Sequence, residues 1–378
     1  MSKRANGEGT YYRAKDGSWR GAIGLPNGKR KFLRAQSQRE IREKIERLHE
    51  LSATINVDFA SVKTAAFLAE WLELIRPSLK AKTWERYEGC VRCHISPALG
   101  RIPVGKLEPR DLQGFYAAKI DSGLSPSTVH QLHRVLHSAL AYCVHMQLLA
   151  TNPAEHVHPP RRPERTMNVW STAQCRQFLE SVASDRFHAL FVLALTTGMR
   201  QGELLALHWS DVDLDRGTLL VRGTLSRTRE GLVITTPKTS RSSRQILLTS
   251  QAVDALRVRQ KQQHEEIQSA GAKWENLDIV FSTIQGGLID KERVLRRHFK
   301  PAIEEAGLPP IRFHDLRHCA ATIMIEAGVH IRVVADILGH ADPSVTLRVY
   351  GHVMPAMHQQ ARSALESAFD RNTPQMSS

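Results

Sequence analysis

Six residues in the second half of the chain carry side chains that together can cut a phosphodiester bond. In chain order they are Arg200, Lys238, His314, Arg317, His340 and Tyr350. Arginine side chains can grip the non-bridging oxygens of a phosphate through planar, bidentate hydrogen bonds, and a phenol can act as the nucleophile. Histidine and lysine can move the protons. The set therefore predicts cleavage of a nucleic-acid strand that needs neither a metal nor any other cofactor.

Most of these residues lie in short, distinctive strings. The strings are Thr197-Gly198-Met199-Arg200-Gln201-Gly202-Glu203-Leu204, Pro237-Lys238-Thr239-Ser240, His314-Asp315-Leu316-Arg317-His318 and Leu338-Gly339-His340. Tyr350 follows shortly after the last of them. The order of the residues and the strings around them resemble the tyrosine recombinase (phage integrase) family, whose catalytic positions all have a counterpart here. The resemblance covers nearly the whole chain.

The resemblance implies how the phosphate is attacked and held. Tyr350 would attack the scissile phosphate, which leaves a 3′-phosphotyrosine and a free 5′ hydroxyl. Arg200 and Arg317 would clamp the phosphate. Glu203 follows Arg200 in the next helical turn, where its carboxylate can orient the guanidinium.

Three further residues are implied to handle protons or bind the phosphate. His314 would assist proton transfer around the tyrosine, His340 would hydrogen-bond the phosphate or the attacking oxygen, and Lys238 would protonate the departing 5′ oxygen. A phenol with a pKa of about 10 is roughly one part in a thousand ionised at pH 7. Tyr350 therefore needs help in losing its proton.

Other interpretations of the same residues stay open at this point. His314 and His318 have the spacing of a zinc motif, although zinc hydrolases of that type need a glutamate where this chain has Asp315. A type IB topoisomerase would use a similar set to nick and reseal DNA. A DNA-binding regulator that had lost catalysis would be expected to lack at least one of the six residues.

Composition favours a polyanionic partner. The 378 residues include 52 Lys plus Arg against 38 Asp plus Glu, a formal net charge of +14. Such a surplus suits DNA because each neutralised phosphate releases condensed counterions, although other basic proteins share it. The cysteines follow no disulfide spacing, and neither a signal peptide nor a membrane span is recognisable. We therefore expect a cytoplasmic protein with reduced thiols.

A chain of this length is expected to fold into two or three domains. The predicted fold is a multidomain one: a small α+β N-terminal domain, an all-α helical bundle, and a mainly α catalytic domain with a small antiparallel β insert. The predicted bounds are residues 1–58, 61–155 and 166–378, with a stiff, basic, proline-rich linker at 156–165.

In the first domain, turn signals at Asp16-Gly17 and Asn27-Gly28 separate three short antiparallel strands. A capping box at Ser37 opens a helix whose apolar stripe can cover one sheet face. The other face would display DNA-binding cations, namely Arg13, Arg20, Lys29, Lys31 and Arg34. A basic sheet of this kind resembles the arm-type DNA-binding domain of phage integrases. A solvated basic hairpin is the alternative.

The second domain shows helical periodicity from Val62 onward, with helices expected over 67–75 and from about Thr83, Glu108 and Ser125. Its strings resemble those of the family's core DNA-binding, SAM-like domain. The strings are His94-Ile95-Ser96-Pro97-Ala98-Leu99-Gly100 and Gly123-Leu124-Ser125-Pro126-Ser127-Thr128-Val129. A plain four-helix bundle would have the same periodicity, so here only the resemblance indicates a function.

The third domain is expected to be mainly helical, with a strand-rich insert at residues 217–248 that carries Lys238. A buried helix over 187–195 should end just before Arg200. On the helix that starts near His314, residues 314, 317 and 318 share one side, opposite Leu316, Ala320 and Ile323. We expect this polar side to point away from the core.

The resemblance also implies the partners and the biological role. The partners would be double-stranded DNA with core and arm attachment sites, a homotetramer on two duplexes, DNA-bending host factors and an excisionase, but no membrane. The role would be site-specific recombination that integrates and excises a phage or another mobile element.

Overall fold

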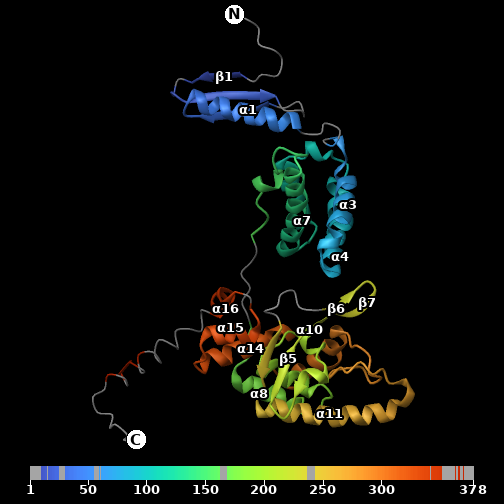
Figure 1. Cartoon of the computed structure of the whole chain (residues 1–378). Coiled ribbons are helices and arrows are strands. Elements are labelled where there is room, and N and C mark those ends of the chain that lie inside the picture. Colours follow the sequence, from blue (N-terminus) through green and yellow to red (C-terminus); the bar gives the residue numbers. More distant parts are fainter. Residues whose placement is uncertain are drawn as a thin grey trace, which may run out of the picture. The chain divides into compact units, whose positions relative to one another are not determined.

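The computed structural model describes residues 10–14, 16–24, 30–54, 59, 61–161, 168–235, 243–340 and 342–350, together with 362, 365, 366 and 369. The chain forms two compact units, Met1–Glu164 and Arg165–Ser378 (Figure 1). Each unit is mainly helical, with one small antiparallel sheet in the first and two in the second, so the predicted fold class is confirmed. No described helix is long and apolar enough to cross a membrane.

The first unit begins with the predicted three-stranded sheet. Its antiparallel strands are β1 (Thr10–Arg13), β2 (Trp19–Gly24) and β3 (Arg30–Ala35), in that order. Helix α1 (Gln38–Thr54) follows, and the Ser37 hydroxyl accepts the backbone N–H of Glu40, as the capping signal predicts. Ile41 and Ile45 are buried against the sheet with Ala35. One sheet face is thus covered by α1, as predicted.

The rest of the first unit is the predicted helical bundle. The expected helices are α3 (Thr64–Ile75), α4 (Ala81–Cys90), α6 (Pro109–Asp121) and α7 (Pro126–His145). Shorter turns lie between and after them: η1 (Arg76–Ser78), η2 (Val91–Ile95), α5 (Ser96–Leu99), η3 (Val104–Lys106) and η4 (Pro153–His156). The bundle and the sheet have separate clusters of buried apolar residues, consistent with two domains. The exact domain bounds stay a prediction.

The second unit is built around a buried helix, α9 (His188–Thr197), whose residues 189–195 are all buried. Packed around it are α8 (Thr172–Ser181), α11 (Ser250–Ala270) and α14 (Phe313–Glu326). Short helices complete the unit: α10 (Gln201–Leu204), η5 (Trp209–Asp211), η7 (Gly271–Lys273), α12 (Lys291–Val294), η8 (Leu295–Phe299), α13 (Lys300–Glu305), α15 (Ile331–Leu338) and α16 (Pro343–Tyr350).

The strand-rich insert forms two small antiparallel sheets. One contains β4 (Val212–Asp213), β5 (Thr218–Val221) and β8 (Arg244–Leu247), and the other is the hairpin β6 (Thr224–Thr228) and β7 (Gly231–Thr235). The hairpin packs tightly on α10. A Cβ atom on Gly202 would lie 2.5 Å from Thr224 Oγ1, so glycine is needed for this approach.

Candidate active site

Arg200 follows the end of helix α9, which positions it at the site. The helix stops at Gly198, whose φ of +62° is a left-handed conformation that glycine adopts without strain. A Cβ atom on Gly198 would also lie 2.5 Å from Leu338 Cδ2, so the turn packs directly under the end of α15. Arg200 then caps the start of α10, and its backbone N–H donates to the Glu203 carboxylate.

Arg317 lies on α14 and is almost completely buried, with 3% of its surface exposed. Its Nη1 donates to the carbonyl of Gly198 at 2.7 Å, and its Nη2 donates to the carbonyl of Leu338 at 2.7 Å. The expectation that this side of α14 faces away from the core is wrong for Arg317. The reason is that α15 and α16 pack over the same helix and form a second apolar cluster there.

Arg200 donates a hydrogen bond to the same stretch of backbone as Arg317. Its Nη2 donates to the carbonyl of Gly339 at 3.4 Å, next to the carbonyl that Arg317 uses. Two guanidinium groups from distant parts of the chain therefore meet at consecutive carbonyls directly before His340. Each guanidinium has five N–H donors, so both keep donors for a further anion. Arg200 is the more accessible of the two, with 40% of its side chain exposed.

Glu203 orients Arg200 as predicted. Its Oε1 accepts Nη1 of Arg200 at 2.7 Å, and its Oε2 accepts the backbone N–H of Arg200 at 3.0 Å. Burial alone would raise the pKa of this carboxyl, but the hydrogen bonds and charges of Arg244 and Arg200 outweigh it and the pKa is lowered. Glu203 is therefore ionised and holds the positively charged groups together.

Arg244, on β8, is a residue of this site that sequence reasoning missed. Its Nη2 donates to Oε2 of Glu203 at 2.9 Å, and its Nε donates to the carbonyl of Ile337 at 2.7 Å. Its side chain is only 8% exposed. A signal was available in the alternation of β8, where Arg244 and Ile246 both occupy the inward-facing positions. An arginine on the inward face of a strand needs an anionic partner.

His340 follows α15 after Gly339, which adopts a left-handed φ of +68°. Its Nδ1 hydrogen-bonds the buried hydroxyl of Thr346 at 2.7 Å. Burial and the charges of Arg317 and Arg200 lower the pKa of His340 to about 4, so it is neutral at pH 7. The ring is fixed beside both arginines in a form that can still donate or accept a hydrogen bond.

Tyr350, the last residue of α16, is buried with 1% of its surface exposed. Its hydroxyl lies 2.6 Å from Nδ1 of His318. The sequence suggested His314 as the neighbour of this phenol, but the ring of His314 instead packs edge-on against that of His318, with 5.2 Å between ring centroids. Burial raises the pKa of Tyr350 to about 12, partly offset by the charge of Arg317.

The arrangement combines positive charge with a hydroxyl nucleophile. Burial and the neighbouring Arg200 lower the pKa of Arg317 to about 9, which still leaves it protonated at pH 7. Arg200 and Arg244 both contact the carboxylate of Glu203, and its charge also acts on Arg317. The positive charge of the three guanidinium groups exceeds the negative charge of Glu203, which favours binding of an anion such as a phosphodiester. Among the residues that the structure describes, no His, Cys, Asp and Glu side chains gather into a group able to hold a metal.

Lys238 lies outside the described residues, but both of its flanks are placed. The chain leaves β7 at Thr235 and returns at Arg244, which contacts Glu203.

The predicted DNA-binding cations of the sheet are only partly described. Arg20 and Arg34 are cross-strand partners, and Nη2 of each lies within 3.2 Å of Oδ2 of Asp16. Arg13 is exposed at the end of β1, but it pairs with Trp19, whose own partner Ala35 packs against α1. The prediction that Arg13 lies on the open face is therefore wrong, because alternation along β1 turns its side chain to the covered face. Lys29 and the side chain of Lys31 lie outside the described part. Two large exposed aromatic residues, Tyr12 and Phe32, accompany the arginines on the open face.

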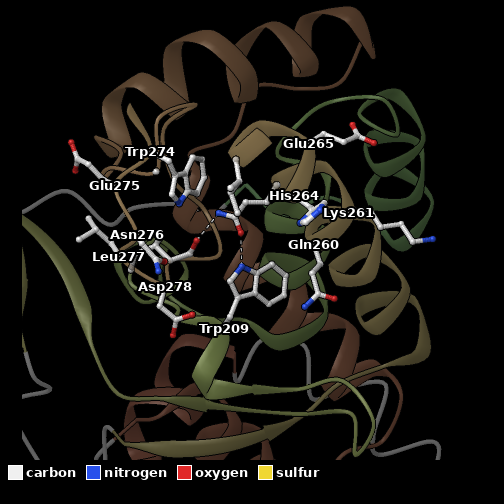
Figure 2. A pocket seen from close by; sticks show the side chains of 14 residues that line it. Trp209, Gln260, Lys261, His264, Glu265, Trp274, Glu275, Asn276, Leu277 and Asp278 are labelled. Carbon is white, nitrogen blue, oxygen red and sulfur yellow. Dashed lines mark hydrogen bonds between the residues drawn. The ribbon is translucent and has the colours of Figure 1, made fainter. Parts of the chain in front are cut away.

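A well-formed pocket of the second unit, about 720 Å³ in volume, contains none of the predicted site residues. It lies beside α11, and Figure 2 shows Trp209 and Trp274 on either side of it. The indole N–H of Trp209 donates to the side chain of Gln263 at its floor. This pocket is separate from the cluster of arginine, histidine and tyrosine residues.

Gly339→Ala should disturb the site through Arg244. A Cβ atom there would lie 2.8 Å from Nη1 of Arg244 and 3.0 Å from its Cζ, so the guanidinium must shift away from Glu203. The left-handed backbone alone costs an alanine about 1 to 2 kcal/mol. We expect a larger loss of unfolding free energy than that, measured by urea denaturation, together with reduced DNA cleavage.

Gly307→Ala is the matched control. Gly307 also has a left-handed φ, +63°, but nothing lies within 4 Å of its added Cβ atom. It should show the backbone cost alone and keep full cleavage activity. Equal effects of the two substitutions would show that Arg244 is not coupled to Gly339.

Comparison with known proteins identifies the family of the chain. Residues 171–357 match the phage integrase family, and residues 65–120 match the N-terminal SAM-like domain of phage integrases. The chain is 30% identical over 367 residues to a XerC-like tyrosine recombinase of Caldanaerobacter subterraneus subsp. tengcongensis, covering 91% of this chain and 93% of that protein. It is 25% identical to an integrase of Saccharopolyspora erythraea, over 97% of this chain and 98% of that one.

Solved structures share the fold. The integrase of transposon Tn1549, in complex with a circular intermediate DNA, superposes with a TM-score of 0.70 at 20% identity, over 80% of this chain and all (100%) of that one. A lambda integrase dimer bound to a core site gives a TM-score of 0.59 at 18% identity, over 92% and 96% of the two chains. Taken with the sequence matches, these findings show that the chain belongs to the phage integrase family and is a tyrosine-type site-specific recombinase.

Proposed function

We propose that this recombinase cuts and rejoins DNA with Tyr350 as the nucleophile, and that it integrates and excises a mobile element. The observation that carries the proposal is that Arg200 and Arg317 donate to consecutive backbone carbonyls directly before His340. The helix that carries Arg317 also positions His318 against the hydroxyl of Tyr350. This places phosphate-binding donors near a phenol. It is the arrangement that an attack on a phosphodiester requires.

In the proposed reaction Tyr350 attacks the phosphorus and a 3′-phosphotyrosine forms as the 5′ oxygen leaves. Arg200 and Arg317 neutralise the charge that develops on the non-bridging oxygens, and His340 donates a further hydrogen bond to the phosphate. Lys238 protonates the departing oxygen. The free 5′ hydroxyl of a partner strand then attacks the phosphotyrosine, so the energy of the bond is retained and no ATP is needed.

Glu203 and Arg244 act through the residues that they hold. Glu203 fixes the guanidinium of Arg200, and Arg244 ties Glu203 to the carbonyl of Ile337 at the end of α15. Because β8 begins at Arg244, the same contact fixes the start of this strand. We infer that Glu203 and Arg244 hold the guanidinium of Arg200 where it can bind the phosphate.

The partner is double-stranded DNA. By analogy with the Tn1549 and lambda integrases, which are seen on circular-intermediate and core-site DNA, we propose that the helical bundle and the second unit bind the core site. The ICEBs1 integrase of Bacillus subtilis is 24% identical over 308 residues, which cover 81% of this chain and 83% of that protein. We propose a tetramer on two duplexes in the cytoplasm, assisted by DNA-bending host factors and an excisionase.

The N-terminal sheet is proposed to bind arm-type DNA sites through its open face. Arg20 and Arg34 are cross-strand partners on this face, and both form ion pairs with Asp16. Lys31 belongs to β3, and Lys29 precedes that strand in the sequence; both add positive charge. Arginine side chains at this density can contact phosphates and guanine edges in a groove.

Recombination between two duplexes is the direct test of the proposed function. Purified protein, given two duplexes that contain the attachment sequence flanking its gene, should yield joint products in buffer with excess EDTA. EDTA should have no effect, because the arginine side chains, and not a metal cation, neutralise the charge of the phosphate. Nicking and resealing without any exchange of partners would favour the topoisomerase alternative.

Truncation separates the proposed arm and core activities. A protein that starts near Ser61 should still cleave core-site DNA, because all six predicted catalytic residues lie beyond the cut, but it should lose binding to arm-site duplexes. A matched Arg20→Gln, Arg34→Gln double variant of the full chain should lower arm affinity and reduce the salt slope, which is about 0.9 per phosphate contacted. Unchanged arm binding by either protein would contradict this role and favour the alternative, a solvated basic hairpin.

A further inference from the structure

The hydroxyl of Tyr350 has a defined partner that sequence reasoning did not assign to it. Nδ1 of His318 lies 2.6 Å from the phenol oxygen, and the two rings are 5.7 Å apart between centroids. His318 is the residue directly after Arg317 on α14, so the helix that buries a phosphate-binding arginine also presents this imidazole to the tyrosine. The ring of His314 packs edge-on against that of His318, with 5.2 Å between the ring centroids.

We propose that Nδ1 of His318 accepts the proton that the Tyr350 hydroxyl loses as its oxygen attacks phosphorus. The proposal rests on the proposed function, in which Tyr350 is the nucleophile. It makes His318 a catalytic residue, since it touches the attacking oxygen. It also moves the role expected of His314 one helical turn along α14.

The local environment suits a proton acceptor. Burial lowers the pKa of His318, so the ring is neutral at pH 7 and its Nδ1 can accept a hydrogen bond. The charged and titratable groups around it are Arg312 at the N-cap of its own helix, His314, Asp315 and Arg317 on that helix, His340 after α15, and Tyr350 on α16. Asp315, which is buried and ionised, favours the imidazolium that forms when the proton arrives.

The proton balance of the step is complete. The bond between the Tyr350 oxygen and phosphorus forms while the bond between phosphorus and the 5′ oxygen breaks. The phenol proton moves to Nδ1 of His318, and the leaving oxygen takes a proton from Lys238. When a 5′ hydroxyl attacks the phosphotyrosine, both transfers run backward and His318 returns the proton to the phenol.

Two substitutions distinguish proton acceptance from simple positioning. His318→Asn keeps a hydrogen-bond acceptor close to the place of Nδ1 but cannot take up a proton, and His318→Ala removes both properties. At pH 7 we expect both variants to bind core-site DNA normally and to form the covalent adduct about 100- to 10,000-fold more slowly, the usual contribution of a general base. His264→Gln, at an exposed position on α11, is the control and should match the wild type.

The pH profile supplies a readout that a structural role would not change. Without the base, cleavage depends on spontaneous ionisation of a phenol whose pKa burial raises to about 12. The rate of both variants relative to the wild type should therefore rise about tenfold per pH unit between pH 7 and 9. Near wild-type activity of His318→Asn would overturn the proposal, because a hydrogen bond alone would then suffice.

A modified substrate separates the two proton transfers. A duplex with sulfur in place of the bridging 5′ oxygen has a leaving group that needs no proton, so it should rescue a loss of Lys238 but not a loss of His318. Full rescue of His318→Ala by this substrate would assign His318 to the leaving-group side and contradict the proposal. Adduct formation by Tyr350→Phe would instead show that the proposed nucleophile is wrong, whichever result His318 gives.

Discussion

Tyr350→Phe should bind a core-site duplex with nearly wild-type affinity and form no covalent adduct with it. The substitution removes only the hydroxyl oxygen, so the ring still fills its place in the apolar cluster with Val334 and Leu338. The nucleophile is lost outright, and no residual rate through this residue is expected. The measurement is a nicked suicide duplex that traps the adduct, followed by denaturing electrophoresis.

The folded state of this variant needs its own measurement. The phenyl ring leaves Nδ1 of His318 without its 2.6 Å partner, and an unsatisfied buried acceptor costs about 1 to 3 kcal/mol. A modest fall in Tm with unchanged DNA affinity is therefore compatible with the assignment. Formation of a denaturant-resistant complex by Tyr350→Phe at the wild-type rate would contradict the assignment.

Arg200→Lys should slow adduct formation by about 100- to 1,000-fold while DNA binding changes little. Lysine keeps the positive charge but has no planar fork, so it cannot hold Glu203, the Gly339 carbonyl and a phosphate oxygen at once. The rate should be measured with saturating protein, so that it reports the chemical step. Arg216→Lys, at an exposed ion pair with Asp213, is the matched control and should be neutral.

Arg317→Lys is expected to lose at least as much activity but is harder to interpret. A single ammonium cannot bridge the carbonyls of Gly198 and Leu338, which are both 2.7 Å from the guanidinium. Loss of these buried hydrogen bonds should also lower the Tm. Arg200 is the sharper test because 40% of its side chain is exposed and the fold depends on it less. Wild-type cleavage by both variants would exclude the two arginines from the site.

Local signals explain why much of the fold was predictable. Turn residues at Asp16-Gly17 separate strands that pair as expected, and the stop at Gly198 follows a helix that is buried on every side. Ser125 caps α7 by accepting the backbone N–H of Thr128. Each of these features depends on neighbouring residues, so the sequence pattern is sufficient to locate it.

The details of the candidate site depend on contacts between distant segments, and the sequence alone missed several. Helical periodicity predicted that Arg317 lies on an exposed face, because it assumes that only one side of a helix packs against a core. In the structure α14 contributes to two apolar clusters, one on each side. His314 and His318 lie on the same side of α14, and only the position of α16 decides which of them meets Tyr350. Arg244 belongs to no recognised string, and its partner Glu203 is 41 residues away.

The central claim is that a covalent bond joins Tyr350 to the 3′ phosphate of cleaved DNA. It is tested most directly by trapping wild-type protein on a nicked core-site duplex in buffer with excess EDTA, digesting the complex and identifying the nucleotide-bearing peptide by mass spectrometry. The account predicts a single modified peptide, with the nucleotide attached to Tyr350 through its phenol oxygen. Attachment at any other residue, or formation of the adduct only after a divalent metal is restored, would contradict it.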